Sequence, residues 1–174
     1  MKNLLIIFLS FFSFNVFCQP FPIPEDNEVS FDVIRKKKII GSLVTKFIEE
    51  DDDNLILHSV LDIEVKILFF PAYKFFQETK ETWKNGEFIS IDGFTDFEDE
   101  REYIILGEDT DKYFIASGMD GELNLDKNIV PLNYWNMNML NENEVFDTQK
   151  GIVRKIDVKK LDNEKIKILD NEIL

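Results

Sequence analysis

The segment 55–70, LILHSVLDIEVKILFF, constrains the fold more than any other part of the chain. One set of alternate positions is apolar or small: Leu55, Leu57, Ser59, Leu61, Ile63, Val65, Ile67 and Phe69. The positions between them include the polar residues His58, Asp62, Glu64 and Lys66. This alternation is typical of a strand that buries one face, because a helix would scatter the apolar residues around its circumference. The sequence therefore predicts a long half-buried strand, ended by Pro71.

The N-terminal part of the pattern predicts a hairpin. Apolar residues at 31–33 and 39–44 flank the basic cluster RKKK at 35–38, which we interpret as a solvated hairpin tip. A long strand is expected over 38–49, and Gly41 within it is typical of a bend or bulge.

Several further strands are expected after Pro71. Asn85-Gly86 lies between two β-like runs, which is the strongest short hairpin signal in a sequence. REYIILGED and DKYFIASGMDG each predict a strand closed by a glycine-containing acidic turn. DTQKGIVRKIDVKKL and EKIKILDNEIL predict strands near the C-terminus, the last preceded by a turn at 161–163.

The segment 131–146 interrupts this β pattern. Tyr134, Met137 and Leu140 are three residues apart, which predicts one or two helical turns laid against the sheet. The expected fold class is mainly β: a curved antiparallel meander, half-barrel or barrel-like, with one short helical insertion near 133–142. Long strands with a single apolar face have to curl or stack to bury it.

The N-terminus has the composition of a secretory signal peptide. Lys2 precedes an apolar run from Leu4 to Phe14 that is too short to span a bilayer comfortably. Val16 and Cys18 fit the positions before a signal-peptidase cut, whereas lipidation of Cys18 is the alternative, disfavoured by the bulky Phe17. We expect residues 1–18 to be removed, 19–28 to form an extended lead-in and 29–174 to form a single β domain.

Export limits the location of the protein. We expect it in the periplasm or outside the cell, with a lipoprotein anchored through Cys18 as the alternative. After cleavage it would not be an integral membrane protein.

The charge of the chain excludes one class of partner. It has 34 Asp and Glu residues against 20 Lys and Arg residues, and a formal net charge of −14. Removal of 1–18, which contains one Lys and no acidic residue, changes −14 to −15. Because nucleic-acid affinity comes largely from Lys and Arg side chains, we expect no nucleic-acid partner.

Two acidic segments invite a metal-site interpretation. EEDDDN at 49–54 lacks the spacing and glycine of an EF-hand loop and is typical of a solvated turn. DGELNLDKN at 120–128 alternates oxygen-bearing side chains, which would share one side of an extended segment. Neither pattern carries a metal prediction, and we expect no cofactor.

The chain offers few groups for catalysis. His58 is its only histidine, so a zinc site built from two or three histidines is impossible. Ser117-Gly118 lacks the pattern of a nucleophile elbow. Paired carboxylates hydrolyse glycosides in other proteins, but 34 acidic residues single out no pair. We predict no catalytic residue and interpret His58 as a surface residue.

Aromatic and methionine side chains are the remaining candidates for a site. Such residues around a cavity mouth hold apolar ligands, and the alternative is that they form the core. The predicted ligand-binding residues are Trp135, Met137, Met139, Trp83 and Tyr134.

Several short motifs occur in a recognisable order: Phe31-x-Val33, Ile40-Gly41, Glu81-x-Trp83-x-x-Gly86, Asn133-x-Trp135-Asn136 and Gln149-x-Gly151. Over about 30–155, they resemble a family of exported bacterial proteins known as a domain of unknown function. That family is similar in shape to the periplasmic lipoprotein-carrier half-barrels. The resemblance implies a curved sheet and brings no catalytic residue.

These observations leave three functional hypotheses. The first is a non-enzymatic exported protein that binds a lipid or another apolar small molecule in its curved sheet. The second is a cell-envelope module that binds a protein partner. The third, less favoured, is a hydrolase that uses carboxylates.

Overall fold

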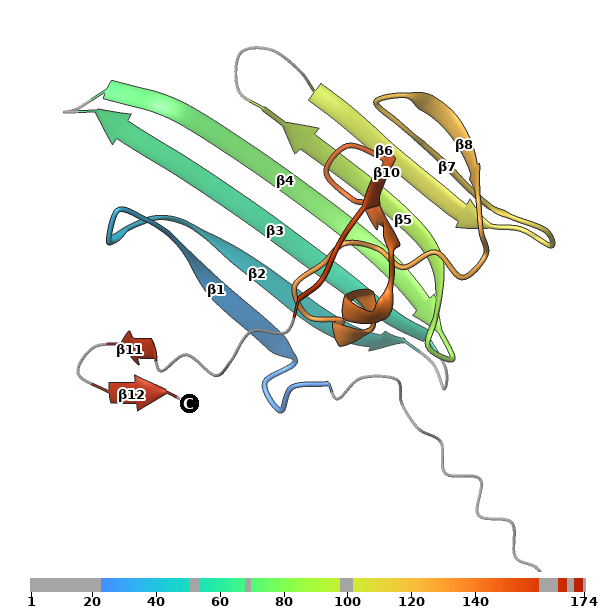
Figure 1. Cartoon of the computed structure of the whole chain (residues 1–174), viewed down its shortest axis with the longest axis horizontal. Coiled ribbons are helices and arrows are strands. Elements are labelled where there is room, and N and C mark those ends of the chain that lie inside the picture. Colours follow the sequence, from blue (N-terminus) through green and yellow to red (C-terminus); the bar gives the residue numbers. More distant parts are fainter. Residues whose placement is uncertain are drawn as a thin grey trace, which may run out of the picture.

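The computed structural model describes residues 23–50, 54–67, 70–97, 102–159, 166–168 and 171–173. The predicted signal peptide 1–18 and the first part of the lead-in, 19–22, lie outside these residues. Within them, eight strands form one antiparallel sheet in sequence order, as predicted (Figure 1). The strands are β1 (Glu28–Arg35), β2 (Lys38–Glu50), β3 (Asn54–Ile67), β4 (Phe70–Lys84), β5 (Glu87–Asp96), β6 (Glu102–Asp109), β7 (Phe114–Gly118) and β8 (Gly121–Leu125). The sheet is open, with β1 and β8 at its edges.

The two predicted hairpin turns are confirmed by their backbone conformations. Lys36 and Lys37 join β1 to β2 with φ of 50° and 64°, and all of RKKK is exposed. Asn85 and Gly86 join β4 to β5 with φ of 50° and 82°. Two consecutive positive φ angles match the right-handed twist of the flanking strands. Both hairpins are therefore fixed by local turn chemistry.

The predicted end of the long strand was wrong. β3 ends at Ile67, and Pro71 lies inside β4, where it pairs with Lys66. β5 pairs with β4 only from Phe76 onward, so no described strand pairs with the other side of β4 at Pro71. A proline has no N–H group to donate, so a strand tolerates it where one of its two sides has no partner strand.

The expected irregularity near Gly41 lies in the neighbouring strand. The register of β1 against β2 shifts between Val33 and Ile34, and Val33 pairs with Gly41. A Cβ added at Gly41 would come within 2.1 Å of the Asp62 carbonyl oxygen in β3. This glycine therefore permits a close approach of two strands.

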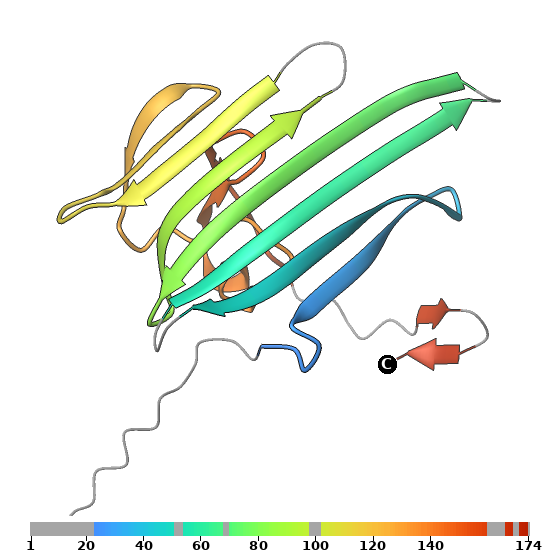
Figure 2. The same cartoon turned by 180° about the vertical axis from the view of Figure 1, so that it is seen from behind.

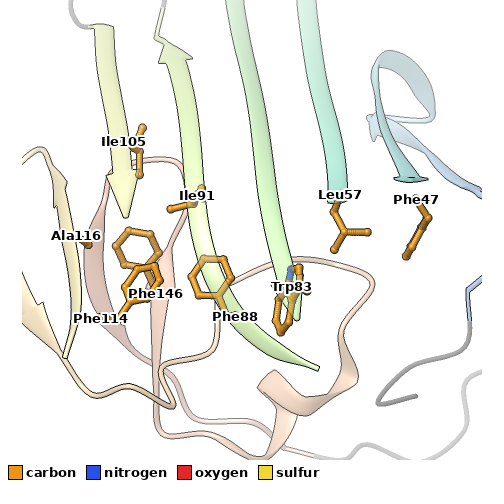
Figure 3. Close-up of a cluster of buried hydrophobic side chains, with 9 residues drawn as sticks. All are labelled: Phe47, Leu57, Trp83, Phe88, Ile91, Ile105, Phe114, Ala116 and Phe146. Carbon is orange, nitrogen blue, oxygen red and sulfur yellow. The ribbon is translucent and has the colours of Figure 1, made fainter. Parts of the chain in front are cut away.

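The side chains of the sheet alternate between an inner and an outer face. The inner face carries the core, and the C-terminal segment lies on it (Figures 1 and 2). Figure 3 shows the buried cluster, to which the C-terminal segment adds Phe146: Phe47, Leu57, Trp83, Phe88, Ile91, Ile105, Phe114, Ala116 and Phe146. Leu57 and Leu61 are buried here, which confirms the predicted inner face of β3.

The helical insertion is shorter than predicted, and its apolar side chains face solvent instead of the sheet. It is a 3₁₀ turn, η1 (Met137–Asn141), which begins where the Asn136 side chain accepts a hydrogen bond from the Asn138 N–H at 3.0 Å. The stripe of Tyr134, Met137 and Leu140 is 67%, 75% and 42% exposed, so it does not pack on the sheet as we expected. Asn136 is buried instead, which turns the apolar stripe toward solvent.

The C-terminal strands are also shorter than predicted. The expected strand 147–161 is replaced by a hairpin of β9 (Glu144–Asp147) and β10 (Ile152–Lys155). The expected strand 164–174 is replaced by β11 (Ile166–Ile168) and β12 (Asn171–Ile173), which pair with each other. Pairing of two short strands satisfies backbone groups that a single edge strand leaves open.

A glycine contact attaches the β9–β10 hairpin to the sheet. The Met119 N–H donates to the Lys150 carbonyl at 2.7 Å. A Cβ added at Gly118 would come within 2.5 Å of the Gly151 Cα. Gly151 itself has φ of +66°, which suits glycine. The end of β7 and the hairpin turn therefore meet backbone to backbone.

Candidate functional site

A cavity of about 150 Å³ lies between the inner face of β2, β3 and β4 and the C-terminal segment. The sheet provides Leu43, Thr45, Ser59, Leu61, Gln77, Thr79 and Glu81. The C-terminal segment provides Leu132, Asn133, Tyr134, Trp135, Asp147, Thr148, Gln149 and Arg154.

The strand register explains why a cavity forms at this place. Thr45 pairs with Ser59, Ser59 with Thr79, and Thr79 with Gly93, so small side chains form a row across four strands. The rows on either side carry larger residues, including Leu61 and Leu57. A row of small side chains leaves space that the C-terminal segment bridges. The Thr45 and Ser59 hydroxyls lie 2.8 Å apart on this cavity floor.

Glu81 is the unusual residue of the cavity. Its exposed fraction is only 2%, although most glutamates of folded proteins lie at the surface. Its Oε2 accepts hydrogen bonds from the Trp83 Nε1–H at 3.0 Å and from the Asn133 amide at 3.4 Å. Burial raises the pKa of Glu81 from 4.5 to about 7, and the two hydrogen bonds partly oppose this rise.

Hydrogen bonds hold the far wall of the cavity on the sheet. The Gln77 amide donates to the Thr148 carbonyl at 3.1 Å and contacts its hydroxyl at 3.4 Å. The Asp147 Oδ1 accepts from the backbone N–H groups of Gln149 and Lys150 at 2.8 and 3.2 Å. Its Oδ2 accepts from Arg154. These hydrogen bonds fix the position of the wall, and both oxygens of the Asp147 carboxylate have partners.

The predicted aromatic residues come together, whereas the methionines do not join them. Trp83 and Trp135 pack edge to face with ring centroids 5.4 Å apart. Trp135 and Tyr134 line the cavity, and Trp83 is buried beside it. Met137 is 75% exposed, and neither it nor Met139 lines the cavity. Ligand binding by these five residues stays a prediction.

An apolar part of the inner face extends from the cavity along β1 to β4. We call this the open apolar surface and define it by Phe31, Leu43, Ile63, Val65 and Tyr73. Phe31 and Tyr73 are 42% and 40% exposed, and the other three are partly exposed. Ile63 and Val65 lie in the C-terminal half of β3, and this half extends beyond β10 (Figure 1). Leu43 and Leu61 line the cavity, so the surface begins at its edge.

His58 lies on the outer face of β3. Its Nε2 is 2.6 Å from Glu78 Oε1, and both side chains are partly exposed. Among the described residues, no cluster of three or more His, Cys, Asp or Glu side chains is arranged to hold a metal ion.

The sequence prediction missed the polar residues of the cavity. Gln77, Thr79 and Glu81 occupy alternate positions of β4 between the buried Phe75 and Trp83. The same period of two that identified β3 places all five on the inner face. Polar residues at alternate positions between two inward-facing aromatic residues were therefore a signal that the sequence contained.

The fold and site together define a class: an open, curved antiparallel sheet with a cavity of mixed polar and apolar lining on its inner face. The chain belongs to the family described as Domain of unknown function (DUF6134), whose model matches residues 31–174. Neither the curated proteins nor the solved structures contain a significant match to it. In the described part of the chain, no helix combines the length and apolar character needed to cross a membrane.

Proposed function

We propose that this is an exported, non-enzymatic protein that binds an amphipathic ligand on the inner face of its sheet. The polar head of the ligand occupies the cavity, and its apolar chain lies along the open apolar surface. Export is proposed from the signal-peptide composition of residues 1–18. The predicted site residues Trp135 and Tyr134 form part of the cavity wall in this proposal.

One observation carries the proposal: a small cavity with polar groups in its wall borders a partly exposed apolar surface. Its volume of about 150 Å³ is below the roughly 300–1,000 Å³ of sites that enclose a drug-sized ligand. The cavity therefore suits a head group, and the apolar remainder has to lie outside it. Leu43 and Leu61 connect the two regions.

Uptake of the apolar dye N-phenyl-1-naphthylamine tests this function. Leu43→Asp places a charge between the cavity and the open apolar surface, and we expect about tenfold weaker dye binding. Trp135→Ala is expected to weaken dye binding as well. Dye fluorescence titrations measure both effects, with circular dichroism as the test of folding.

Val44→Asp is the matched control for Leu43→Asp. Val44 is the next residue of β2, is similarly half-buried and points to the outer face. The Val44→Asp substitution should leave dye binding unchanged. Equal dye binding by the two folded variants, or none by the unmodified protein, contradicts the proposal.

A second candidate function is an envelope module that binds a protein partner. It is favoured by Ile104 and Leu106 on the outer face of β6, which are 67% and 48% exposed. If the protein is such a module, dye uptake need not depend on Leu43. The same titration therefore separates the two candidates. The cavity gives less support to a carboxylate hydrolase, because Asp147 is already engaged by Arg154 and two backbone N–H groups.

A further inference from the structure

We propose that the head group held in the cavity is an ammonium ion, so that the ligand is an alkylamine whose cationic end lies against Glu81. This inference rests on the proposed function, because it specifies the head group of that ligand. It follows from the charges, hydrogen-bond acceptors and aromatic rings that line the cavity.

The charges of the cavity wall do not balance. Arg154 is the one Lys or Arg side chain among the cavity residues, and it pairs with Asp147. Ionised Glu81 therefore has no cation within the cavity. A buried carboxylate without a compensating charge is costly, and a bound cation removes that cost. Charge complementarity selects a cationic ligand over an anionic or neutral one.

The hydrogen-bond groups of the cavity also fit a donor. Both hydrogen bonds that the structure gives to Glu81 end on Oε2. The hydroxyl oxygens of Thr45, Ser59 and Thr79 line the same cavity and can accept hydrogen bonds. An ammonium group presents three N–H donors and no acceptor. One carboxylate oxygen with neighbouring hydroxyls is a suitable acceptor set for it.

Two aromatic side chains line the same space. Trp135 and Tyr134 contribute to the cavity wall opposite the sheet. A cation near the face of a tryptophan or tyrosine ring is stabilised by the ring quadrupole. Carboxylate and aromatic groups thus approach the cavity from two different segments of the chain.

The proposal has a pH dependence. Burial raises the pKa of Glu81 to about 7, whereas an alkylamine stays protonated to about pH 10. The titratable or charged groups that share the cavity are Tyr134, Asp147 and Arg154. Affinity for an amine should therefore rise between pH 6 and pH 8 as Glu81 ionises, and affinity for a neutral alcohol should not.

Calorimetric titration of the protein with n-octylamine and with 1-octanol tests the inference. At pH 8 and 0.15 M salt, we expect the amine to bind about tenfold or more tightly than the alcohol, because a hydrogen bond between charged groups is stronger than one to a neutral hydroxyl. Glu81→Gln keeps the shape and one acceptor oxygen. It should abolish the preference for the amine, so that the variant binds the two compounds with similar affinity.

Glu78→Gln is the matched control, because it removes the same charge from the outer face of β4. Equal loss of amine binding in both variants would show a general charge effect and overturn the inference. Equal affinity of the unmodified protein for amine and alcohol would also overturn it, while leaving the proposed function standing. Binding of neither compound would remove the proposed function itself. If Glu81→Gln does not fold, amine affinity that is flat between pH 6 and 8 in the unmodified protein overturns the inference.

Discussion

Glu81 is the residue on which both the stability and the proposed recognition of this protein depend. It is buried and accepts two hydrogen bonds on one oxygen. A fold that needed only stability would favour an apolar residue at this position, because replacing a buried charge by an apolar group of similar shape is often stabilising. Its presence between buried aromatic residues is therefore what the proposed cationic ligand would explain.

The raised pKa of Glu81 predicts how stability depends on pH. Between 4.5 and about 7, the native state binds this proton and the unfolded state does not, so stability falls as pH rises through that range. Above about 7, the contribution of Glu81 is constant. Each pH unit is worth about 1.4 kcal/mol, which gives a loss of up to about 3 kcal/mol.

Glu81→Gln removes this titration. Urea denaturation at pH 5 and pH 7.5 should show that the variant gains up to about 3 kcal/mol of stability relative to the unmodified protein over this range. Both proteins share all other acidic residues, so the difference isolates Glu81. Parallel stability curves for the two proteins would contradict the pKa rise.

Residue types alone could have identified part of the site. The alternation Phe75, Gln77, Thr79, Glu81, Trp83 points polar groups inward, and the Trp83 position was predicted to bind ligand. The partners Asn133 and Thr148 could not be inferred, because they are 52 and 71 residues from the sheet residues that they bind. Contacts over such separations leave no local pattern.

At the scale of the elements, the sequence predicts correctly those strands and turns that depend on residues close together in the chain. The alternation within β3 and the Asn85-Gly86 turn act over a few residues, so the meander follows from them. The end of β3 and the orientation of η1 depend on neighbouring strands and on the buried Asn136. These elements were predicted wrongly, as were the two C-terminal strands, because tertiary contacts overrode short apolar patterns.

The contact of Gly118 with Gly151 predicts a specific instability of the β9–β10 hairpin. Gly118→Ala would place a Cβ within 2.5 Å of the Gly151 Cα, so the hairpin has to move away from β7. We expect a loss of about 1–3 kcal/mol, measured by urea denaturation. Ser117→Ala, one residue earlier, is the control and should have a small effect. A Gly118→Ala variant as stable as this control would show that the contact is not tight.

At the scale of the whole molecule, the candidate site and the core share one face of an open sheet. The C-terminal segment covers one end of this face and forms a cavity there, while the other end remains apolar and partly exposed (Figures 1 and 2). The open form of the sheet is what leaves this surface accessible. A closed barrel would have buried it.

Methyl NMR during titration with n-octylamine tests directly whether a ligand binds on the inner face of the sheet. The methyl groups of Leu43 and Leu61 report on the inner face, and those of Val44 and Val60 report on the outer face of the same two strands. Binding on the inner face predicts saturable shifts of the methyl signals of the two leucines, with little change in those of the two valines. Shifts confined to the valines, or no shift at any of the four residues, would contradict binding on the inner face.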